Sequence, residues 1–369
     1  MEGLAVTSAQ GPSVNSFSDK QYWFGKRVFV TGHTGFKGGW LVALLQHCGA
    51  NVKGYALPPE TEPNLFSALN IPDLCQSTFG DIRDKSKLHS EVSDFSPEIV
   101  FHLAAQPLVR RSYKLPLETF ETNVMGTINL LESCRLQPEL HTILVITTDK
   151  VYQNKEQLRP YREDDPLGGH DPYSASKAAT ELAVQAWRKS FFGPEKRVRI
   201  ATARAGNIIG GGDWSMDRLI PDCIRAIKTG STLTIRSPRA IRPWQHVADA
   251  INGYLLLAEI MADNGSPLPN AFNFGPSGND SVSVADVVEL VNDHCGQKLD
   301  YMFTEDPDAP HESGLLTLDS SKARSLLGWT PRLSANEAVK VTLDWHDLHD
   351  KSPTSQALLD YTIGQIRAR

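Results

Sequence analysis

The chain has 369 residues, of which 40% are hydrophobic and 22% are charged. This composition excludes an intrinsically disordered chain, a collagen-like repeat and a small disulfide-stapled domain. With 37 basic and 43 acidic residues, the net charge of −6 gives no reason to expect nucleic acid or an acidic membrane as a partner. Five scattered cysteines without a C-x-x-C pair favour reduced thiols over a disulfide framework or a zinc site, so we expect no metal.

Residues 1–20 are small and polar, and they lack the basic start and the apolar run of a signal peptide. We expect them to form a flexible tail, as termini often do. No apolar run in the chain comes near the ~18–20 residues needed to cross a bilayer. The sequence therefore predicts a cytoplasmic protein.

Apolar runs typical of buried strands alternate with helix-length segments from residue 26 to about residue 205. The strands are expected over residues 26–31, 51–57, 74–79, 98–104, 142–147 and 198–204. The helices between them are expected over residues 38–49, 84–95, 119–137 and 172–190. Continuously apolar strands separated by helices indicate a parallel sheet that is covered on both faces. The sequence therefore predicts an α/β fold with a doubly wound parallel (Rossmann) sheet.

The pattern changes after residue 205, where the chain becomes rich in Gly, Pro and Arg. Further elements are expected as a helix, a strand and three short helices, over residues 246–261, 271–275, 284–294, 320–327 and 336–348. We expect a dinucleotide-binding unit of residues 21–205 plus about 245–275, and a smaller α/β substrate-binding unit of residues 206–244 plus 276–369. Ligands of doubly wound sheets bind outside the carboxyl ends of the strands, so the second unit should cover that edge.

A glycine-rich loop follows the first strand, with glycines at Gly32, Gly35 and Gly38 before a helix. The first glycine permits a sharp turn, the second lets the backbone approach a pyrophosphate, and the third allows close packing of helix on strand. The pyrophosphate then faces the free N–H groups and the positive end of the helix dipole. Because this loop sits in a βαβ context, it predicts a dinucleotide-binding site.

The sequence after the second strand does not choose between NAD and NADP. An acidic residue about 20 positions beyond the loop usually selects NAD, but Glu60 lies out of place behind two prolines and no arginine stands there for a 2′-phosphate. Asp81, after the third strand, has two possible roles. It either receives the adenine amino group or serves as a turn or helix-capping carboxylate.

Two polar groups of residues fall where the cleft should be. Tyr173 and Lys177 share one face of a helix, and the ammonium would favour the phenolate and so proton removal from a hydroxyl group while hydride leaves the same carbon. Thr148, Asp149 and Lys150 directly follow the fifth strand, at the carboxyl edge of the sheet. The alternatives are an ordinary amphipathic helix start for the first pair and turn chemistry at a strand exit for the second group.

At these residues the chain resembles the extended short-chain dehydrogenase/reductase family of nucleotide-sugar enzymes, and within it the 4,6-dehydratases. The resemblance covers residues ~22 to ~350. Sister dehydratases of dTDP- or GDP-sugars carry Asp-Glu where this chain has Asp149-Lys150, so the resemblance is nearest to the branch that acts on CDP-glucose. Thr148 replaces the typical Ser and Val151 the typical Cys. Further matching segments are GHTGFKGGW (32–40), GDIRD (80–84), AAQPLVR (104–110), NVMG (123–126), RAGN (204–207), GGGDW (210–214) and RPWQHV (242–247).

The resemblance implies NAD as cofactor and a nucleotide sugar as substrate. It implies cofactor contacts at Gly32, Thr34, Gly35, Phe36, Lys37, Gly38, Asp81, Ile82, Ala104, Ala105, Thr122, Thr147, Tyr173 and Lys177. It implies substrate contacts at Gln106, Asn207, Arg218, Leu219, Arg242 and His311, of which the arginines suit a diphosphate because they bind phosphate in a forked geometry. It also implies a homodimer or homotetramer that forms through the helices expected over 119–137 and 172–190.

The resemblance further implies a hydro-lyase reaction with an internal redox cycle, of a kind used in deoxysugar biosynthesis. Tyr173 would accept the C4 hydroxyl proton while Thr148 holds the same oxygen. Asp149 would protonate the departing C6 hydroxyl, and Lys150, assigned by position, would remove the C5 proton, which requires a partly neutral amine. A nucleotide-sugar C4 epimerase or reductase, a dehydratase of another nucleotide sugar, and a cofactor-binding protein without catalysis remain alternatives.

Overall fold

The computed structural model describes residues 20–192, 198–262, 269–276, 282–296, 299–304 and 314–367. Nearly all of the predicted N-terminal tail and the predicted substrate residue His311 lie outside these ranges. Within them, no helix is long and apolar enough to cross a membrane.

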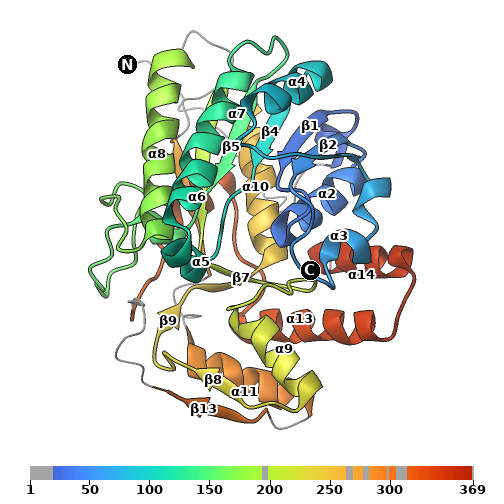
Figure 1. Ribbon diagram of the computed structural model, residues 1–369, viewed down its shortest axis with the longest axis vertical. Helices are drawn as coiled ribbons and strands as arrows, with labels where there is room; N and C mark the ends of the chain where they lie inside the picture. Colours follow the sequence, from blue (N-terminus) through green and yellow to red (C-terminus); the bar gives the residue numbers. More distant parts are fainter. Residues whose placement is uncertain are drawn as a thin grey trace, which may run out of the picture.

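Seven parallel strands form the central sheet, in the order β11-β6-β5-β4-β1-β2-β3 (Figure 1). The order reverses between β1 and β4, which is where open α/β sheets bind their ligands. The predicted doubly wound sheet is therefore confirmed. The strands are β1 (Arg27–Thr31), β2 (Asn51–Ala56), β3 (Gln76–Phe79), β4 (Ile99–His102), β5 (Thr142–Ile146), β6 (Arg199–Ala205) and β11 (Ala271–Phe274).

Helices cover both faces of this sheet, which explains why β4 and β5 are buried along their whole length. On one face Val28 and Val30 pack in a core with α2 (Phe36–His47) and α10 (Val247–Ala262). Phe29 points to the opposite face because side chains alternate along a strand. There it joins a second core with helices α4 (Lys85–Phe95), α7 (Gly126–Cys134) and α8 (Pro172–Phe191).

A smaller unit lies beyond the carboxyl ends of the strands, around α9, α11 and α13 (Figure 1). Its helices are α9 (Leu219–Thr229), α11 (Val284–Cys295) and α13 (Ala335–Asp350). Its short strands are β7 (Asn207–Ile209), β8 (Leu233–Ile235), β9 (Ile241–Arg242), β10 (Trp244–His246), β12 (Val282–Ser283) and β13 (Tyr301–Phe303), which pair in twos.

The packing of the C-terminal residues departs from the predicted division of the chain. Helix α12 (Ser321–Leu327) packs on β11 and α10, and α14 (Ser355–Arg367) packs on α2 and α10. Both helices therefore cover the dinucleotide-binding side, although we predicted all of residues 276–369 in the substrate unit. Apolar residues of α14 complete the face of α2 and α10, a tertiary demand that no local pattern in the sequence reveals.

Two helical regions differ from the prediction. Helix α9 was not predicted because it lies in the Gly- and Pro-rich stretch, but its Pro221 falls in the first turn, where proline is tolerated. The predicted helix over 119–137 consists instead of α6 (Pro116–Phe120), a π-helical turn (Glu121–Met125) and α7. The remaining helices are α1 (Lys20–Trp23), α3 (Leu65–Ala68) and α5 (Val109–Lys114).

Candidate active site

Two cavities adjoin at the carboxyl edge of the sheet, where the strand order reverses. One, of about 380 Å³, lies above the loop between β1 and α2, and the other, of about 370 Å³, lies between the ends of β5 and β6 and the smaller unit. We call them the glycine-loop cavity and the β5-end cavity. Their linings share five residues, which mark the place where the cavities meet: Lys37, Pro107, Leu108, Asp213 and Arg218.

The glycine loop keeps open a space that side chains would fill. Gly32 has a φ of +79°, which other residues rarely adopt. A Cβ atom on Gly38 would overlap the carbonyl oxygen of Gly32. Gly35 is the N-cap of α2 and offers no side-chain acceptor to the first turn of the helix. The loop therefore fits a dinucleotide, because it presents backbone N–H groups to a pyrophosphate at close range.

The structure brings together most of the predicted cofactor residues in the glycine-loop cavity. Thr147 and Tyr173 instead line the β5-end cavity. Lys177 is buried beside the strand end, where its Nζ donates to the carbonyl oxygen of Ile146 at 2.9 Å. Those in the glycine-loop cavity are Gly32, Thr34, Gly35, Phe36, Lys37, Gly38, Asp81, Ile82, Ala104, Ala105 and Thr122.

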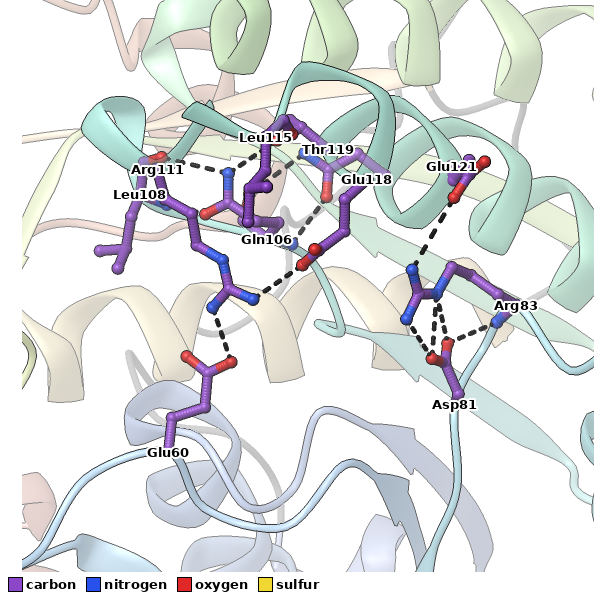
Figure 2. Close-up of polar contacts among 11 residues, drawn as sticks. Glu60, Asp81, Arg83, Gln106, Leu108, Arg111, Leu115, Glu118, Thr119 and Glu121 are labelled. Carbon is purple, nitrogen blue, oxygen red and sulfur yellow. Dashed lines mark hydrogen bonds and ion pairs between the residues drawn. The ribbon is translucent and has the colours of Figure 1, made fainter. Parts of the chain in front are cut away.

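Asp81 is held by its own turn and by a neighbouring cation (Figure 2). Its carboxylate accepts from the backbone N–H of Arg83 at 2.8 Å and pairs with the guanidinium at 2.6 Å. The hydrogen bonds from Arg83 hold the pKa of Asp81 below its ordinary value. The sequence left two roles open for Asp81, and in the structure it acts as the turn carboxylate. Its side chain also lines the glycine-loop cavity.

A second ion-pair group stands on the same rim and was not predicted. Arg111 of α5 pairs with Glu60 at 2.9 Å and with Glu118 of α6 at 2.7 Å (Figure 2). All three residues line the glycine-loop cavity. The sequence could not assign a role to Glu60, because its partner Arg111 lies 51 residues further along the chain.

Gln106 organises its own loop, and this differs from the predicted contact with the sugar. Its side-chain amide donates to the carbonyl oxygen of Leu108 and to the hydroxyl of Thr119, and its oxygen accepts from the Leu108 N–H (Figure 2). The buried Asn123 holds the backbone N–H and carbonyl of Gln106 from behind. Because every side-chain polar atom of Gln106 is bonded within the protein, the structure favours a positioning role for it.

The predicted catalytic residues converge on one wall of the β5-end cavity. Thr148 follows β5, and Asp149 and Lys150 begin the 3₁₀ turn Asp149–Val151. Tyr173 stands in the first turn of α8, whose N-cap is Asp171. All four candidate side chains, from Thr148, Asp149, Lys150 and Tyr173, line the cavity.

These side chains form a buried group. The Thr148 hydroxyl donates to Oδ1 of Asp149 at 2.9 Å, and Tyr173 lines the same cavity beside them. Oδ2 of Asp149 is buried and has no hydrogen-bond partner among the described residues. A buried acceptor without a partner is costly, so this oxygen is placed for a ligand group.

Burial also sets the protonation of the surrounding groups. Desolvation raises the pKa of Tyr173 to about 12 and lowers the pKa of Lys177 to about 8. Desolvation lowers the pKa of Lys37 to about 7, with the nearby cations Arg218 and Lys177 acting in the same direction. Basic side chains that lose their charge this easily are typical of sites that move protons.

Four of the six predicted substrate residues lie in the smaller unit. Asn207, Arg218, Leu219 and Arg242 all line the β5-end cavity. Arg218 lies 3.6 Å from Asp213, and Arg242 is buried, with one guanidinium nitrogen donating to the carbonyl oxygen of Ile241. Two arginines therefore line the same cavity as Tyr173 and Asp149.

A buried ion pair that the sequence did not reveal supports the end of β5. Glu181 of α8 accepts from Arg204 of β6 and from the hydroxyl of Thr147 at 2.7 Å. Burial raises the pKa of Glu181, but hydrogen bonds from Arg204 and the threonines outweigh it and leave the pKa below its ordinary value. Glu181 therefore ties the helix that carries Tyr173 both to β6 and to Thr147, the neighbour of Thr148.

Comparison with known proteins places this geometry in a family. A family model described as GDP-mannose 4,6 dehydratase matches residues 29–342. The chain is 47% identical over 332 residues to the CDP-glucose 4,6-dehydratase of Salmonella typhimurium, covering 89% of this chain and 92% of that protein. The chain belongs to the GDP-mannose 4,6-dehydratase family.

Membership of the GDP-mannose 4,6-dehydratase family confirms the resemblance predicted from the motifs. The UDP-glucose 4-epimerase of Halalkalibacterium halodurans is similar at 28% identity over 87% of this chain and 96% of that protein. The solved structure of MoeE5 in complex with UDP-glucose and NAD matches with a TM-score of 0.72 and 26% identity, covering 88% of this chain and 99% of that one. Proteins named as epimerases and as dehydratases are thus both similar to this chain, so the fold alone does not decide the chemistry.

Proposed function

We propose that this protein is a hydro-lyase that converts CDP-D-glucose to CDP-4-dehydro-6-deoxy-D-glucose with NAD as cofactor. The observation that carries this proposal is the wall of the β5-end cavity, which combines Tyr173 with the pair Asp149 and Lys150. A C4 epimerase or a reductase needs the tyrosine but has no use for an added acid and base. The 47% identity to a CDP-glucose 4,6-dehydratase favours CDP-glucose over other nucleotide sugars.

The cofactor would lie in the glycine-loop cavity, with its pyrophosphate over the Gly32–Gly38 loop. When bound, NAD supplies a temporary store for the hydride that leaves C4 of the sugar and later enters C6. The chain's own contribution begins with Tyr173, which takes the proton of the C4 hydroxyl. Lys177 supports this step because a nearby cation stabilises the phenolate.

Elimination of water needs an acid at the C6 oxygen and a base at C5. We assign the acid to Asp149, whose buried Oδ2 has no hydrogen-bond partner among the described residues and could give a proton to the C6 hydroxyl. Lys150 lines the same cavity and is our hypothesis for the base that takes the C5 proton, which the neighbouring C4 ketone makes acidic. A Lys150→Met variant should oxidise C4 but release water at least ~100-fold more slowly. A near-normal rate of water release would remove Lys150 from this role.

The substrate's diphosphate would face the smaller unit. Arg218 and Arg242 present guanidinium groups to the cavity, and Asn207 adds an amide beside them. Arginine binds a diphosphate through paired hydrogen bonds, so these residues suit the phosphate groups better than the uncharged part of the sugar.

We also propose that the protein forms a cytoplasmic homodimer or homotetramer through α6, α7 and α8. These helices pack beside one another on one side of the molecule (Figure 1). Large apolar side chains of α6, of the π-helical turn after it and of α8 are exposed, and a second copy of the chain would cover them. The most exposed are Leu117, Met125 and Leu182, at 80%, 51% and 57% exposure.

Incubation with CDP-, dTDP-, GDP- and UDP-glucose in turn tests the proposed reaction. We expect CDP-glucose to give the 4-keto-6-deoxy product, detected by its absorbance in alkali, without any added reduced cofactor. An epimerase would return a 4-epimer with its C6 hydroxyl intact, and a reductase would require added reduced cofactor. Either result, or turnover confined to another nucleotide sugar, would overturn the assignment to CDP-glucose.

A further inference from the structure

Three arginines among the described residues line the glycine-loop cavity, and each of them is paired with a carboxylate. NADP differs from NAD only by a phosphate group on the 2′-oxygen of the adenosine ribose, and dinucleotide sites that accept NADP hold this phosphate with an arginine. A cavity whose arginines are already paired offers it no open cation. The pairs are Arg83 with Asp81 at 2.6 Å, Arg218 with Asp213 at 3.6 Å, and Arg111 with Glu60 and Glu118 at 2.9 and 2.7 Å.

Glu60 comes from the part of the chain that faces the adenosine ribose in dinucleotide-binding folds. There an acidic residue after the second strand usually contacts the ribose 2′-hydroxyl. Residues 56–61, at and beyond the end of β2, all line the glycine-loop cavity, and Glu60 is the charged residue among them. The Thr34 hydroxyl of the glycine loop donates to the carbonyl oxygen of Leu57 at 2.8 Å. This bond holds the start of the segment, and with it Glu60, at the rim of the cavity.

The group around Arg111 carries more negative than positive charge. Arg111 lies between Glu60 and Glu118, and it donates one hydrogen bond to each carboxylate (Figure 2). Two carboxylates therefore share one guanidinium, and the group of three has a net charge of about −1 at neutral pH. A 2′-phosphate at this rim would be repelled by the excess charge, and it would have to compete with two carboxylates for the guanidinium.

We propose that Glu60 and Glu118 select NAD over NADP by keeping Arg111 paired, so that it is closed to a 2′-phosphate. This inference rests on the cofactor of the proposed function and not on its sugar substrate. The selection works by rejection, because the carboxylates make the wrong cofactor bind less well and add no contact to the right one. Arg111 would bind a 2′-phosphate if both carboxylates were removed.

The partial exposure of this group limits the size of the effect. The side chains of Glu60, Arg111 and Glu118 are 57%, 35% and 31% exposed, so water and salt screen their charges. The discrimination against NADP should therefore be moderate, and it should weaken as the ionic strength rises. Exposed ion pairs also contribute little to stability, so substitutions at these positions should leave the protein folded.

Equilibrium titration with NAD and with NADP, followed by quenching of protein fluorescence, tests this selection. The double variant Glu60→Gln/Glu118→Gln frees Arg111, so the Kd for NADP at low salt should fall at least ~10-fold. The Kd for NAD should stay within about fivefold of the parent, because the lost pairs are exposed. Adding Arg111→Ala to the double variant should remove most of the gain. An unchanged ratio of the two Kd values in the double variant would overturn the proposal, as would a gain that survives Arg111→Ala.

Two shorter ligands locate the effect at the adenosine end of the cofactor. Adenosine 2′,5′-bisphosphate carries the 2′-phosphate without the nicotinamide half, and AMP lacks that phosphate. The double variant should bind the bisphosphate at least ~10-fold more tightly than the parent does and bind AMP within about fivefold of it. An equal improvement for both ligands would mean a general change of charge in the cavity and would contradict selection at the 2′-position.

Glu121→Gln is the matched control, because it removes an exposed carboxylate close by that is not among the described lining residues of the cavity. Its ratio of Kd values for NADP and NAD should stay within about twofold of the parent. A shift as large as that of the double variant would show that net charge decides, and it would overturn the role of the Arg111 group. Failure of the parent protein to bind NAD would instead overturn the cofactor of the proposed function.

Discussion

The two adjoining cavities are built from different parts of the chain. The Gly32–Gly38 loop of the glycine-loop cavity is shaped by the main chain, because Gly32 and Gly38 leave no room for side chains, while distant segments complete the cavity lining. The β5-end cavity depends on side chains from the end of β5, α8 and the smaller unit, which lie far apart in the sequence. The glycine loop therefore depends on local geometry, and the catalytic wall depends on the tertiary structure that assembles it.

The largest expected effect on catalysis comes from a substitution in the β5-end cavity. A Tyr173→Phe variant should lose about 10²–10⁴-fold in the first hydride transfer, because no group remains to take the C4 proton. Its affinity for NAD should stay within about threefold of the parent, since the glycine-loop cavity is unchanged. Single-turnover absorbance of reduced nicotinamide measures the first quantity and equilibrium titration the second. A matching loss in both would show that the cavities are not separable.

A second substitution changes the glycine-loop cavity and leaves the catalytic side chains in place. In Gly38→Ala the new methyl group overlaps the Gly32 carbonyl oxygen, so the cofactor-free protein should lose about 1–3 kcal/mol of unfolding free energy. Affinity for NAD should fall at least ~10-fold as the loop shifts. Urea unfolding and cofactor titration measure these two changes.

Gly35→Ala is the matched control within the same loop. Its Cβ would lie 3.5 Å from the Gly32 carbonyl oxygen, an ordinary contact, and Gly35 has an extended backbone that any residue adopts. The free protein should therefore lose less than about 1 kcal/mol. Affinity for NAD should still fall, because the methyl group stands where the pyrophosphate approaches. Equal destabilisation by both substitutions would contradict this steric account.

The difference between the cavities also explains which features the sequence predicts. Largely apolar strands such as β4 and β5 predict a parallel sheet that is covered on both faces. Closely spaced glycines after the first strand predict the dinucleotide-binding loop. The polar residues Thr148, Asp149 and Lys150 after β5 indicate the candidate catalytic site, because the carboxyl ends of parallel strands meet at one edge of the sheet. These are local patterns, and each needs only a few neighbouring residues.

Features that depend on distant partners escape a local pattern. The pairing of Glu60 with Arg111 and that of Glu181 with Arg204 join segments that only the folded chain brings together. From the sequence we expected the Gln106 amide to contact the sugar. In the structure this amide donates instead to the Leu108 carbonyl oxygen and to the Thr119 hydroxyl. Helix α14 is amphipathic, yet nothing near it tells which core it completes.

A change of intermediate size concerns Lys177, the buried lysine of α8 beside the end of β5. Because burial lowers the pKa of Lys177 from 10.5 to about 8, the folded protein loses this proton at a lower pH than the unfolded chain does. Below about pH 8 the buried charge destabilises the fold fully, and the penalty fades between about pH 8 and pH 10.5. A Lys177→Met variant should therefore be more stable than the parent by about 1–3 kcal/mol near neutral pH.

Urea unfolding at several pH values measures this difference. The stability gain of Lys177→Met should shrink as the pH rises through the window, because the parent sheds its buried charge there. Lys189→Met, at an exposed position of the same helix, should show no such trend. A gain that stays constant with pH would mean that packing, and not charge, causes it.

The smallest expected effect is at the rim of the glycine-loop cavity. Arg111 links Glu60, in the loop after β2, to Glu118 of α6, so the group spans two sides of the cavity (Figure 2). Each pair is partly exposed, so its removal by Arg111→Ala should cost only about 0.2–1 kcal/mol. We expect NAD to leave up to about fivefold faster, with turnover at saturating NAD unchanged. Stopped-flow displacement of the bound cofactor measures the release rate.

Salt distinguishes an ion-pair effect from a change of shape at this rim. In the parent, NAD release should accelerate as ionic strength rises, because screening weakens exposed pairs. Arg111→Ala should have lost most of this response, since its contribution is already absent. Arg159→Ala removes a comparable exposed pair with Asp165 that does not border the cavity, and it should release NAD as the parent does. A parent without any salt response would show that the main-chain cradle alone sets the residence time of the cofactor.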